Sequence, residues 1–344
     1  MNRLATSYLG LDLRSPLVAS AGPLTRRVDS AARLQQSGAA AVVLPSLFEE
    51  EVVHEEVELD RALEQGAESF AEALDYHPDV EEVESVADRY LATIAEMKTE
   101  LDVPVIASLN ATSSGGWIRF AKLIEEAGAD ALELNLYRIA ADAARSGADM
   151  EASDLDVVRE VRAATALPFA VKISPYYSAL ANFGLAAVGA GANGLVLFNR
   201  FYQPDLDPDS RQVEPRLELS RPWELRLPLR WIAILHPQVD GRASLAASSG
   251  VHSGIDAAKA LLVGADVAMM TSALLHHGPT HIAAVENELV AWMDANDYES
   301  VDQLRGSVSY TASDDPSAFE RANYLRTLRS WNAPLDLKSK PQPD

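Results

Sequence analysis

Six lysines occur in the 344-residue chain, and one of them, Lys172, lies within an apolar segment that reads as a buried strand, Phe169–Ile173. An ammonium group in such a segment is costly unless a negative or electron-rich group meets it. Glu133, in a second apolar segment, is one candidate as a buried ion-pair partner. A bound ligand is the other candidate. The partner of Lys172 is therefore the first clue to function.

Three asparagines, Asn110, Asn135 and Asn199, each stand at the carboxyl end of a predicted strand. Because side chains alternate between the two faces of a strand, Asn135 shares a face with Glu133, and Lys172 lies on the polar face of its own strand. A single asparagine at a strand end is usually a loop cap. Three of them together with a lysine offer donors and acceptors to a planar heterocycle, and we expect a ligand site there.

Two short segments rich in Ser, Thr and Gly follow the last two predicted strands, Ser248–Val251 and Met270–Ala273. Such loops can cradle a phosphate through backbone N–H groups, a helix N-terminus and hydroxyls. Each is a weak signal alone, because Ser and Gly also make ordinary turns. A phosphate site combined with a polar site for a planar ring suggests FMN.

The elements that position these residues are eight short apolar runs, which alternate with helical patterns. The predicted strands are Leu17–Ala21, Ala40–Leu44, Val105–Asn110, Ala131–Leu136, Phe169–Ile173, Gly194–Phe198, Ser244–Ala247 and Asp266–Met270. The predicted helices between them include Val28–Gln36, Trp117–Ala127, Asp154–Ala164, Ala179–Val188 and Ile255–Val263. Nearly continuous apolar strands are typical of parallel sheets that are covered on both faces. We therefore predict an α/β fold, a (β/α)8 TIM barrel with its site at the carboxyl ends of the strands.

The residues in excess of a minimal barrel fall into insertions after strands 2, 4 and 6, at 49–90, 137–152 and 200–227, and a C-terminal helical extension from about 298. We expect one FMN-binding domain over residues 1–330 and a flexible tail over 331–344. An open doubly wound sheet is the alternative fold, but no G-x-G-x-x-G follows the first strand.

Composition excludes several classes of protein. The formal net charge of −22 argues against a nucleic-acid surface. The chain has no cysteine, so an iron–sulfur relay, if one is used, must come from a separate electron-transfer partner. No segment has the apolar length of a membrane span or the pattern of a signal peptide. We expect a cytoplasmic homodimer that binds a small-molecule substrate, without a metal, nucleic acid or membrane.

The chain resembles the dihydroorotate dehydrogenase family, and most closely a dihydroorotate dehydrogenase-like branch of its soluble class. The resemblance runs from about Tyr8 to about Arg305. It rests on the segments Ser15–Gly22, Leu132–Leu136 and Val171–Tyr176, the strand that ends at Asn199, the turn Gly250–Val251 and the run Thr271–Leu274.

The resemblance implies an FMN site and a role for each residue in it. Lys172 lies beside N1 and O2 of the flavin ring, where a fixed cation tunes the cofactor. Asn135 and Asn199 face both the flavin and the substrate. The other residues that it assigns to the cofactor are Ser20, Ala21, Gly22, Ser46 and Asn110 at the flavin, and Ser249, Gly250, Val251, Thr271 and Ser272 at the phosphate.

The departures from the family fall mostly on the substrate side. Arg138 stands where the family has a Cys or Ser base, and an arginine cannot act as an ordinary base at neutral pH. Arg200 replaces a Ser or Thr, Pro45 replaces a flavin-contacting Lys, and Ser249 replaces the first glycine of a Gly-Gly turn. Arg138 and Arg200 could instead bind a substrate carboxylate. Substitutes for the base are chosen by proximity alone, and they are Tyr137, Ser146 and Tyr176.

Three functions follow from these residues. The first is an FMN-dependent oxidoreductase acting on a CH–CH group, with dihydroorotate, the substrate of pyrimidine biosynthesis, as the default. The second is a flavin-binding electron-transfer or assembly subunit without dihydroorotate turnover, which Arg138 favours. The third is a Schiff-base lyase that uses Lys172, which a neighbouring Glu133 disfavours.

Overall fold

The computed structural model describes residues 2–68, 85–110, 113–200, 203–320, 324 and 328. Within them the main sheet is a closed barrel of eight parallel strands, in the order β3-β4-β5-β6-β7-β8-β11-β12. Their bounds are β3 Leu17–Ala19, β4 Val42–Phe48, β5 Val105–Asn110, β6 Ala131–Asn135, β7 Phe169–Ile173, β8 Gly194–Leu197, β11 Ser244–Ser248 and β12 Val267–Met270. Every predicted strand is present, and the TIM barrel is confirmed.

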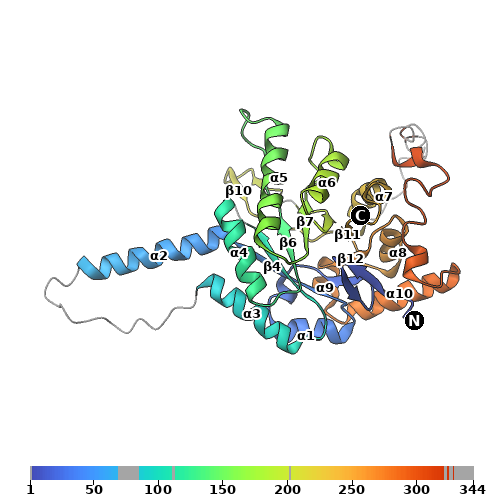
Figure 1. Cartoon of the computed structure of the whole chain (residues 1–344), viewed down its shortest axis with the longest axis horizontal. Coiled ribbons are helices and arrows are strands. Elements are labelled where there is room, and N and C mark those ends of the chain that lie inside the picture. The colour runs from blue at the N-terminus through green and yellow to red at the C-terminus, as the bar shows by residue number, and fades with distance from the viewer. Residues whose placement is uncertain are drawn as a thin grey trace.

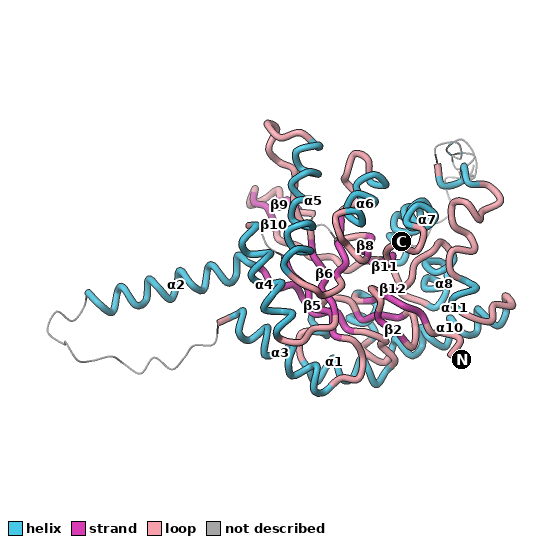
Figure 2. The backbone as a smooth tube through the Cα atoms, viewed as in Figure 1, coloured by secondary structure: helices cyan, strands magenta, loops and turns pink. Residues whose placement is uncertain are grey.

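Helices surround the strands (Figures 1 and 2). Their bounds are α1 Val28–Ser37, α2 Glu49–Glu68, α3 Val86–Glu100, α4 Ser114–Glu126, α5 Gly147–Ala164, α6 Leu180–Gly189, α7 Arg226–Val239, α8 Gly254–Leu262, α9 Ser272–His277, α10 His281–Ala295 and α11 Val301–Leu304, with short 3-10 helices η1 Pro23–Thr25, η2 Pro222–Leu225 and η3 Pro316–Phe319. The predicted helix at Asp154 in fact begins at Gly147, because Ser146 and Asp149 form a capping box there. Its polar first turns carry no apolar period, so the pattern predicted too late a start.

The alternation of side chains divides the core into two layers. One cluster fills the barrel interior and includes Val18, Ile106, Ala170 and Val196. The larger cluster lies between the strands and the helices and includes Leu132 and Leu134 of β6. The polar faces of β5, β6 and β7 therefore point inward, as the alternation predicts.

An N-terminal hairpin covers the other end of the barrel. Strands β1 (Thr6–Tyr8) and β2 (Leu11–Leu13) pair antiparallel, and Tyr8 and Leu9 are buried in the interior cluster. The Leu9 N–H donates to Ser244 Oγ at 3.0 Å. A Cβ at Gly194 would lie 2.7 Å from a Leu9 methyl, so the glycine makes room for this plug. Apolar side chains thus close the barrel beneath the inward polar residues.

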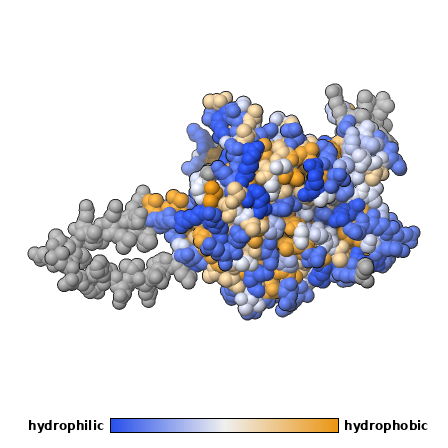
Figure 3. Space-filling model, viewed as in Figure 1, coloured by the Kyte–Doolittle hydropathy of each residue, from blue (hydrophilic) through white to orange (hydrophobic). Residues whose placement is uncertain are grey.

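The insertions after β4 and β8 lie where they were expected, whereas the one predicted at 137–152 ends at residue 146, because α5 begins at Gly147. The one after β4 forms α2, which extends away from the barrel (Figure 1), and α3, which returns to it. The visible face is largely hydrophilic, with scattered hydrophobic residues (Figure 3). The insertion after β8 holds a hairpin of β9 (Asp205–Asp207) and β10 (Gln212–Glu214). Residues 69–84 and the predicted tail at 331–344 lie outside the described residues.

Candidate functional site

Lys172 and Glu133 form a buried ion pair inside the barrel. The Lys172 Nζ lies 3.2 Å from Glu133 Oε1, and the two side chains are 10% and 2% exposed. The second carboxylate oxygen, Glu133 Oε2, is buried without a hydrogen-bond partner among the described residues. The ion-pair alternative for Lys172 is therefore present in the structure. The orphaned oxygen leaves the pair with one unused acceptor.

A chain of polar side chains crosses the barrel mouth beside this pair. The Asn199 amide donates to Asn135 Oδ1. The Asn135 amide donates to Ser46 Oγ at 3.4 Å, and Ser46 Oγ lies 2.8 Å from Ser108 Oγ. Residue 46 follows the bulge of β4, and residues 108, 135 and 199 lie on or after three further strands. Asn110 is buried at the end of β5. The structure thus gathers the polar residues predicted to contact a planar ring.

The end of β3 lies against the end of β12. The Ser20 N–H donates to the Met270 carbonyl at 3.0 Å, and the Thr271 hydroxyl donates to the Ala21 carbonyl at 3.3 Å. A Cβ on Gly22 would lie 2.6 Å from the Thr271 methyl. Residues predicted for the flavin and for the phosphate therefore meet at one edge of the mouth.

The turn after β11 has a left-handed backbone at two successive residues, Ser249 with φ 76° and Gly250 with φ 82°. A Cβ on Gly250 would lie 2.5 Å from the backbone nitrogen of Leu225. Only glycine fits at this position without displacing backbone. Ser249, where the related family has glycine, adopts a conformation that glycine prefers.

Ser220, which the sequence analysis missed, joins the two predicted phosphate loops. The Gly250 N–H donates to Ser220 Oγ at 3.3 Å. The backbone N–H and the hydroxyl of Ser220 both donate to Ser272 Oγ, each at 2.9 Å. A serine hydroxyl has two acceptor sites and one proton, so Ser272 retains its proton for another acceptor. No motif marks Ser220, because its role depends on where the 200–227 excursion returns to the barrel.

Two histidines contact backbone carbonyls next to these loops. His252 Nε2 lies 2.8 Å from the Ser220 carbonyl, and His281 Nε2 lies 2.9 Å from the His252 carbonyl. A carbonyl only accepts, so both ring nitrogens carry the proton. Burial lowers the pKa of His252. His276 and His277 occupy the last turn of α9. No group of three or more metal-ligating side chains occurs within the described ranges.

Arg138 is held by a buried carboxylate. Its Nη1 lies 3.4 Å from Asp154 Oδ1 on α5, and the Tyr177 hydroxyl donates to Asp154 Oδ2 at 2.9 Å. Burial raises the pKa of Asp154, while Tyr177 and Arg138 act in the opposite direction. Part of the Arg138 fork is thus committed to α5. Among the proposed substitutes for the base, Ser146 serves as the N-cap of α5 and bonds Asp149.

Arg200 lines a pocket of about 780 Å³ beside the mouth, together with Asn199 and Ser249. Its guanidinium donates to the Glu218 carbonyl and to the Glu224 carboxylate, both at 2.7 Å. Tyr176 and Trp223 line the same pocket, and both side chains are well exposed. The structure therefore places Arg200 next to Asn199, with an acidic partner of its own.

Comparison with known proteins supports the family resemblance that the residues indicate. The family model for dihydroorotate dehydrogenase matches residues 81–293. The NAD(+)-type dihydroorotate dehydrogenase B catalytic subunit of Methanothermobacter thermautotrophicus is 26% identical over 88% of this chain and 97% of its own length. The protein of the same name in Thermoplasma acidophilum is 23% identical over 89% and 99%. The one in Methanopyrus kandleri is 31% identical over 54% and 61%.

No helix in the described part of the chain combines the length and apolarity needed to cross a membrane.

Proposed function

The chain belongs to the dihydroorotate dehydrogenase family, and on that premise we propose that it is an FMN-dependent oxidoreductase acting on a CH–CH group, with dihydroorotate as the default substrate. The observation that carries the proposal is the convergence of Lys172, Asn135 and Asn199 at the carboxyl ends of β7, β6 and β8. Functional sites of this barrel lie at that end.

The residues present fit FMN. A flavin ring needs both donors and acceptors, which the Lys172 ammonium and the two asparagine amides supply. The orphaned Glu133 Oε2 adds a buried acceptor behind them. At the loops after β11 and β12, the proton of Ser272, which meets no acceptor among the described residues, suits a phosphate oxygen.

In this proposal each group of residues has one task. Lys172 holds a fixed positive charge against the polar edge of the ring, and Glu133 keeps that ammonium in place. Asn135 and Asn199 orient ring and substrate. FMN, when bound, supplies the group that accepts or gives the hydride.

The test is an anaerobic titration of FMN-loaded protein with dihydroorotate, followed by the flavin absorbance. We expect FMN to bind and its absorbance to bleach within a turnover. A protein that takes up no FMN from excess cofactor would refute the proposal.

A second function is favoured by Arg138. Because its guanidinium stands at the position of the family's base and pairs with Asp154, the chain could bind flavin without oxidising dihydroorotate. In that case FMN binds, dihydroorotate leaves the flavin oxidised, and a reduced carrier from a partner chain bleaches it.

A Schiff-base lyase is less well supported. An imine-forming lysine must attack a carbonyl carbon with a free Nζ, whereas the Lys172 Nζ lies 3.2 Å from the buried Glu133 carboxylate. Borohydride trapping of a carbonyl substrate on Lys172 would reverse this ranking.

A further inference from the structure

Strand β4 is interrupted just before the residue that it contributes to the site. Its pairing with β5 is regular at Val43, which lies opposite Ile106, and resumes at Ser46, which lies opposite Ser108. Two residues of β4, Leu44 and Pro45, therefore oppose the single residue Ala107. This is a β-bulge, a feature that redirects the side chains that follow it.

The bulge disturbs the ladder at one residue of β5. The Val42 N–H donates to the Pro104 carbonyl at 3.0 Å, so the even-numbered residues of β5 direct their backbone groups toward β4. The N–H and carbonyl of Ser108 therefore face the bulge. Ser108 lies in a fully buried strand, where unpaired backbone groups are costly.

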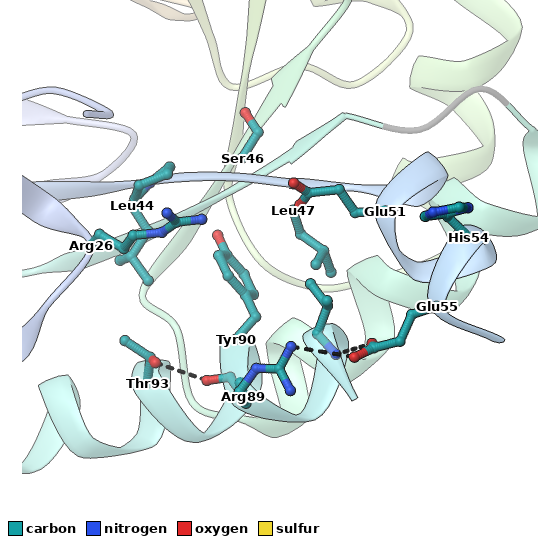
Figure 4. A pocket seen from close by; sticks show the side chains of 12 residues that line it. Arg26, Leu44, Ser46, Leu47, Glu51, His54, Glu55, Arg89, Tyr90 and Thr93 are labelled. Atoms are coloured by element: carbon teal, nitrogen blue, oxygen red, sulfur yellow. Dashed lines mark hydrogen bonds and ion pairs between the residues drawn. The ribbon is translucent and has the colours of Figure 1, made fainter. Parts of the chain in front are cut away.

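Tyr90 of α3 forms a hydrogen bond with each of these two backbone groups. Its hydroxyl accepts from the Ser108 N–H at 2.9 Å and donates to the Ser108 carbonyl at 3.0 Å. In Figure 4 the Tyr90 ring rises from α3 with its hydroxyl toward β4, and Ser46 points to the opposite side of that strand. The ring lines a pocket of about 610 Å³ that also contains Arg26 and His54. One phenol thus bonds both backbone groups of Ser108 from outside the barrel.

The completed bulge determines where Ser46 points. Ser46 Oγ lies 2.8 Å from Ser108 Oγ and accepts from the Asn135 amide, which in turn bonds Asn199. Two of these four residues, Ser46 and Ser108, are anchored at the bulge. A change in the bulge would therefore reach the asparagines that are proposed to contact the ring.

We propose that Tyr90 is a positioning residue for the ring-binding site, because its hydroxyl bonds both backbone groups of Ser108 beside the β4 bulge and so fixes Ser46, Ser108 and Asn135 at the mouth. This inference rests on the proposed function, since the ring is the flavin. Tyr90 itself lies behind β4 and acts only through that strand.

The test compares Tyr90→Phe with Tyr298→Phe in the full-length protein. The Tyr298 hydroxyl lies 3.1 Å from Ser307 Oγ, outside the barrel, so this control also removes one phenol hydroxyl and a hydrogen bond. Amide hydrogen exchange of the segment 105–110 is measured without added FMN. Titration with FMN then gives its dissociation constant and the shape of the flavin absorption band, and thermal unfolding gives the stability of each variant.

We expect faster exchange at the Ser108 amide, a changed flavin band and FMN binding weaker by about fivefold or more in Tyr90→Phe, since two net hydrogen bonds are lost. Tyr298→Phe should keep the wild-type band and affinity. If Tyr90→Phe does not fold, Ser108→Ala offers the second variant, because it removes the Ser108 Oγ–Ser46 Oγ contact and should shift the band with Tyr90 intact; an unchanged band would overturn the positioning role.

The outcomes separate the two proposals. Wild-type protein that binds no FMN overturns both. Wild-type protein that binds FMN, with an unchanged band and affinity in Tyr90→Phe, keeps the proposed function and overturns the positioning role. Equal losses of affinity in both tyrosine variants, in step with their stability, also overturn it.

Discussion

Replacing Glu133 by Gln removes the charge that faces Lys172 and keeps nearly the same shape. The Lys172 side chain is only 10% exposed, so water cannot take over as its partner. Removing one member of a buried pair typically costs about 3–5 kcal/mol, because the other charge stays buried and uncompensated.

We therefore expect Glu133→Gln to lower the free energy of unfolding by about 3–4 kcal/mol at pH 7. An unfolding entropy of about 2 cal/mol/K per residue implies a fall in Tm of roughly 4–6 °C for a chain of this length. Urea unfolding followed by circular dichroism measures the free energy, and calorimetry measures the Tm.

The matched control is the double variant Glu133→Leu with Lys172→Met, which removes both charges. Replacing a buried pair by apolar residues is often neutral, so this variant should recover most of the lost stability while losing the donor to the ring. Two outcomes would refute the reasoning that the pair is buried and mutually compensated. One is a Glu133→Gln protein as stable as the wild type, and the other is a double variant less stable than Glu133→Gln.

Four further outcomes follow from the structure. Gly250→Ala should lower the free energy of unfolding by about 3 kcal/mol or more, because its Cβ would meet the Leu225 backbone. The control Gly241→Ala, left-handed at φ 70° with nothing within 4 Å, should lower it by about 1 kcal/mol. Equal losses in urea unfolding would contradict this. Ser249→Gly should stabilise the fold by about 1 kcal/mol, measured in the same way, since it relieves a left-handed serine. Burial lowers the pKa of His236 and His252 below 6.5, so the unfolded chain binds more protons and the free energy of unfolding should fall as the pH drops through that value. His252→Gln should lessen this fall between pH 7 and about pH 5.5. Parallel curves of stability against pH for the variant and the wild type would count against it. Asp154→Asn and Arg138→Gln should be non-additive by about 0.5–1.5 kcal/mol in a double-mutant cycle of unfolding free energies, whereas strict additivity would mean that the ion pair contributes nothing.

The barrel could be predicted from the sequence because its evidence is local. Each strand is a short apolar run, and alternation along β6 and β7 predicts that Glu133 and Lys172 point inward. The same rule placed Asn135 on the same face as Glu133. Period and polarity are properties of neighbouring residues, so they can be determined without knowledge of the packing.

The parts that the sequence did not reveal depend on segments that meet only in the folded chain. Tyr90 lies in a helix 18 residues before Ser108 and carries no motif. Ser220 reaches Gly250 and Ser272 because a long excursion returns there. Asp154, the partner of Arg138, is likewise set by the position of α5, a helix whose start the sequence pattern predicted too late.

The apolar plug of Tyr8 and Leu9 has an electrostatic consequence for the site above it. Because the barrel is closed below, the charges of Lys172 and Glu133 meet solvent only through the mouth. A planar ring across that mouth would remove the remaining water, and its attraction to the ammonium would then act in a low dielectric medium. Counterions screen exposed charges far better than enclosed ones. The affinity for a planar ring at the mouth should therefore change little with added salt. The affinity for a carboxylate at the more open Arg200 pocket should decrease.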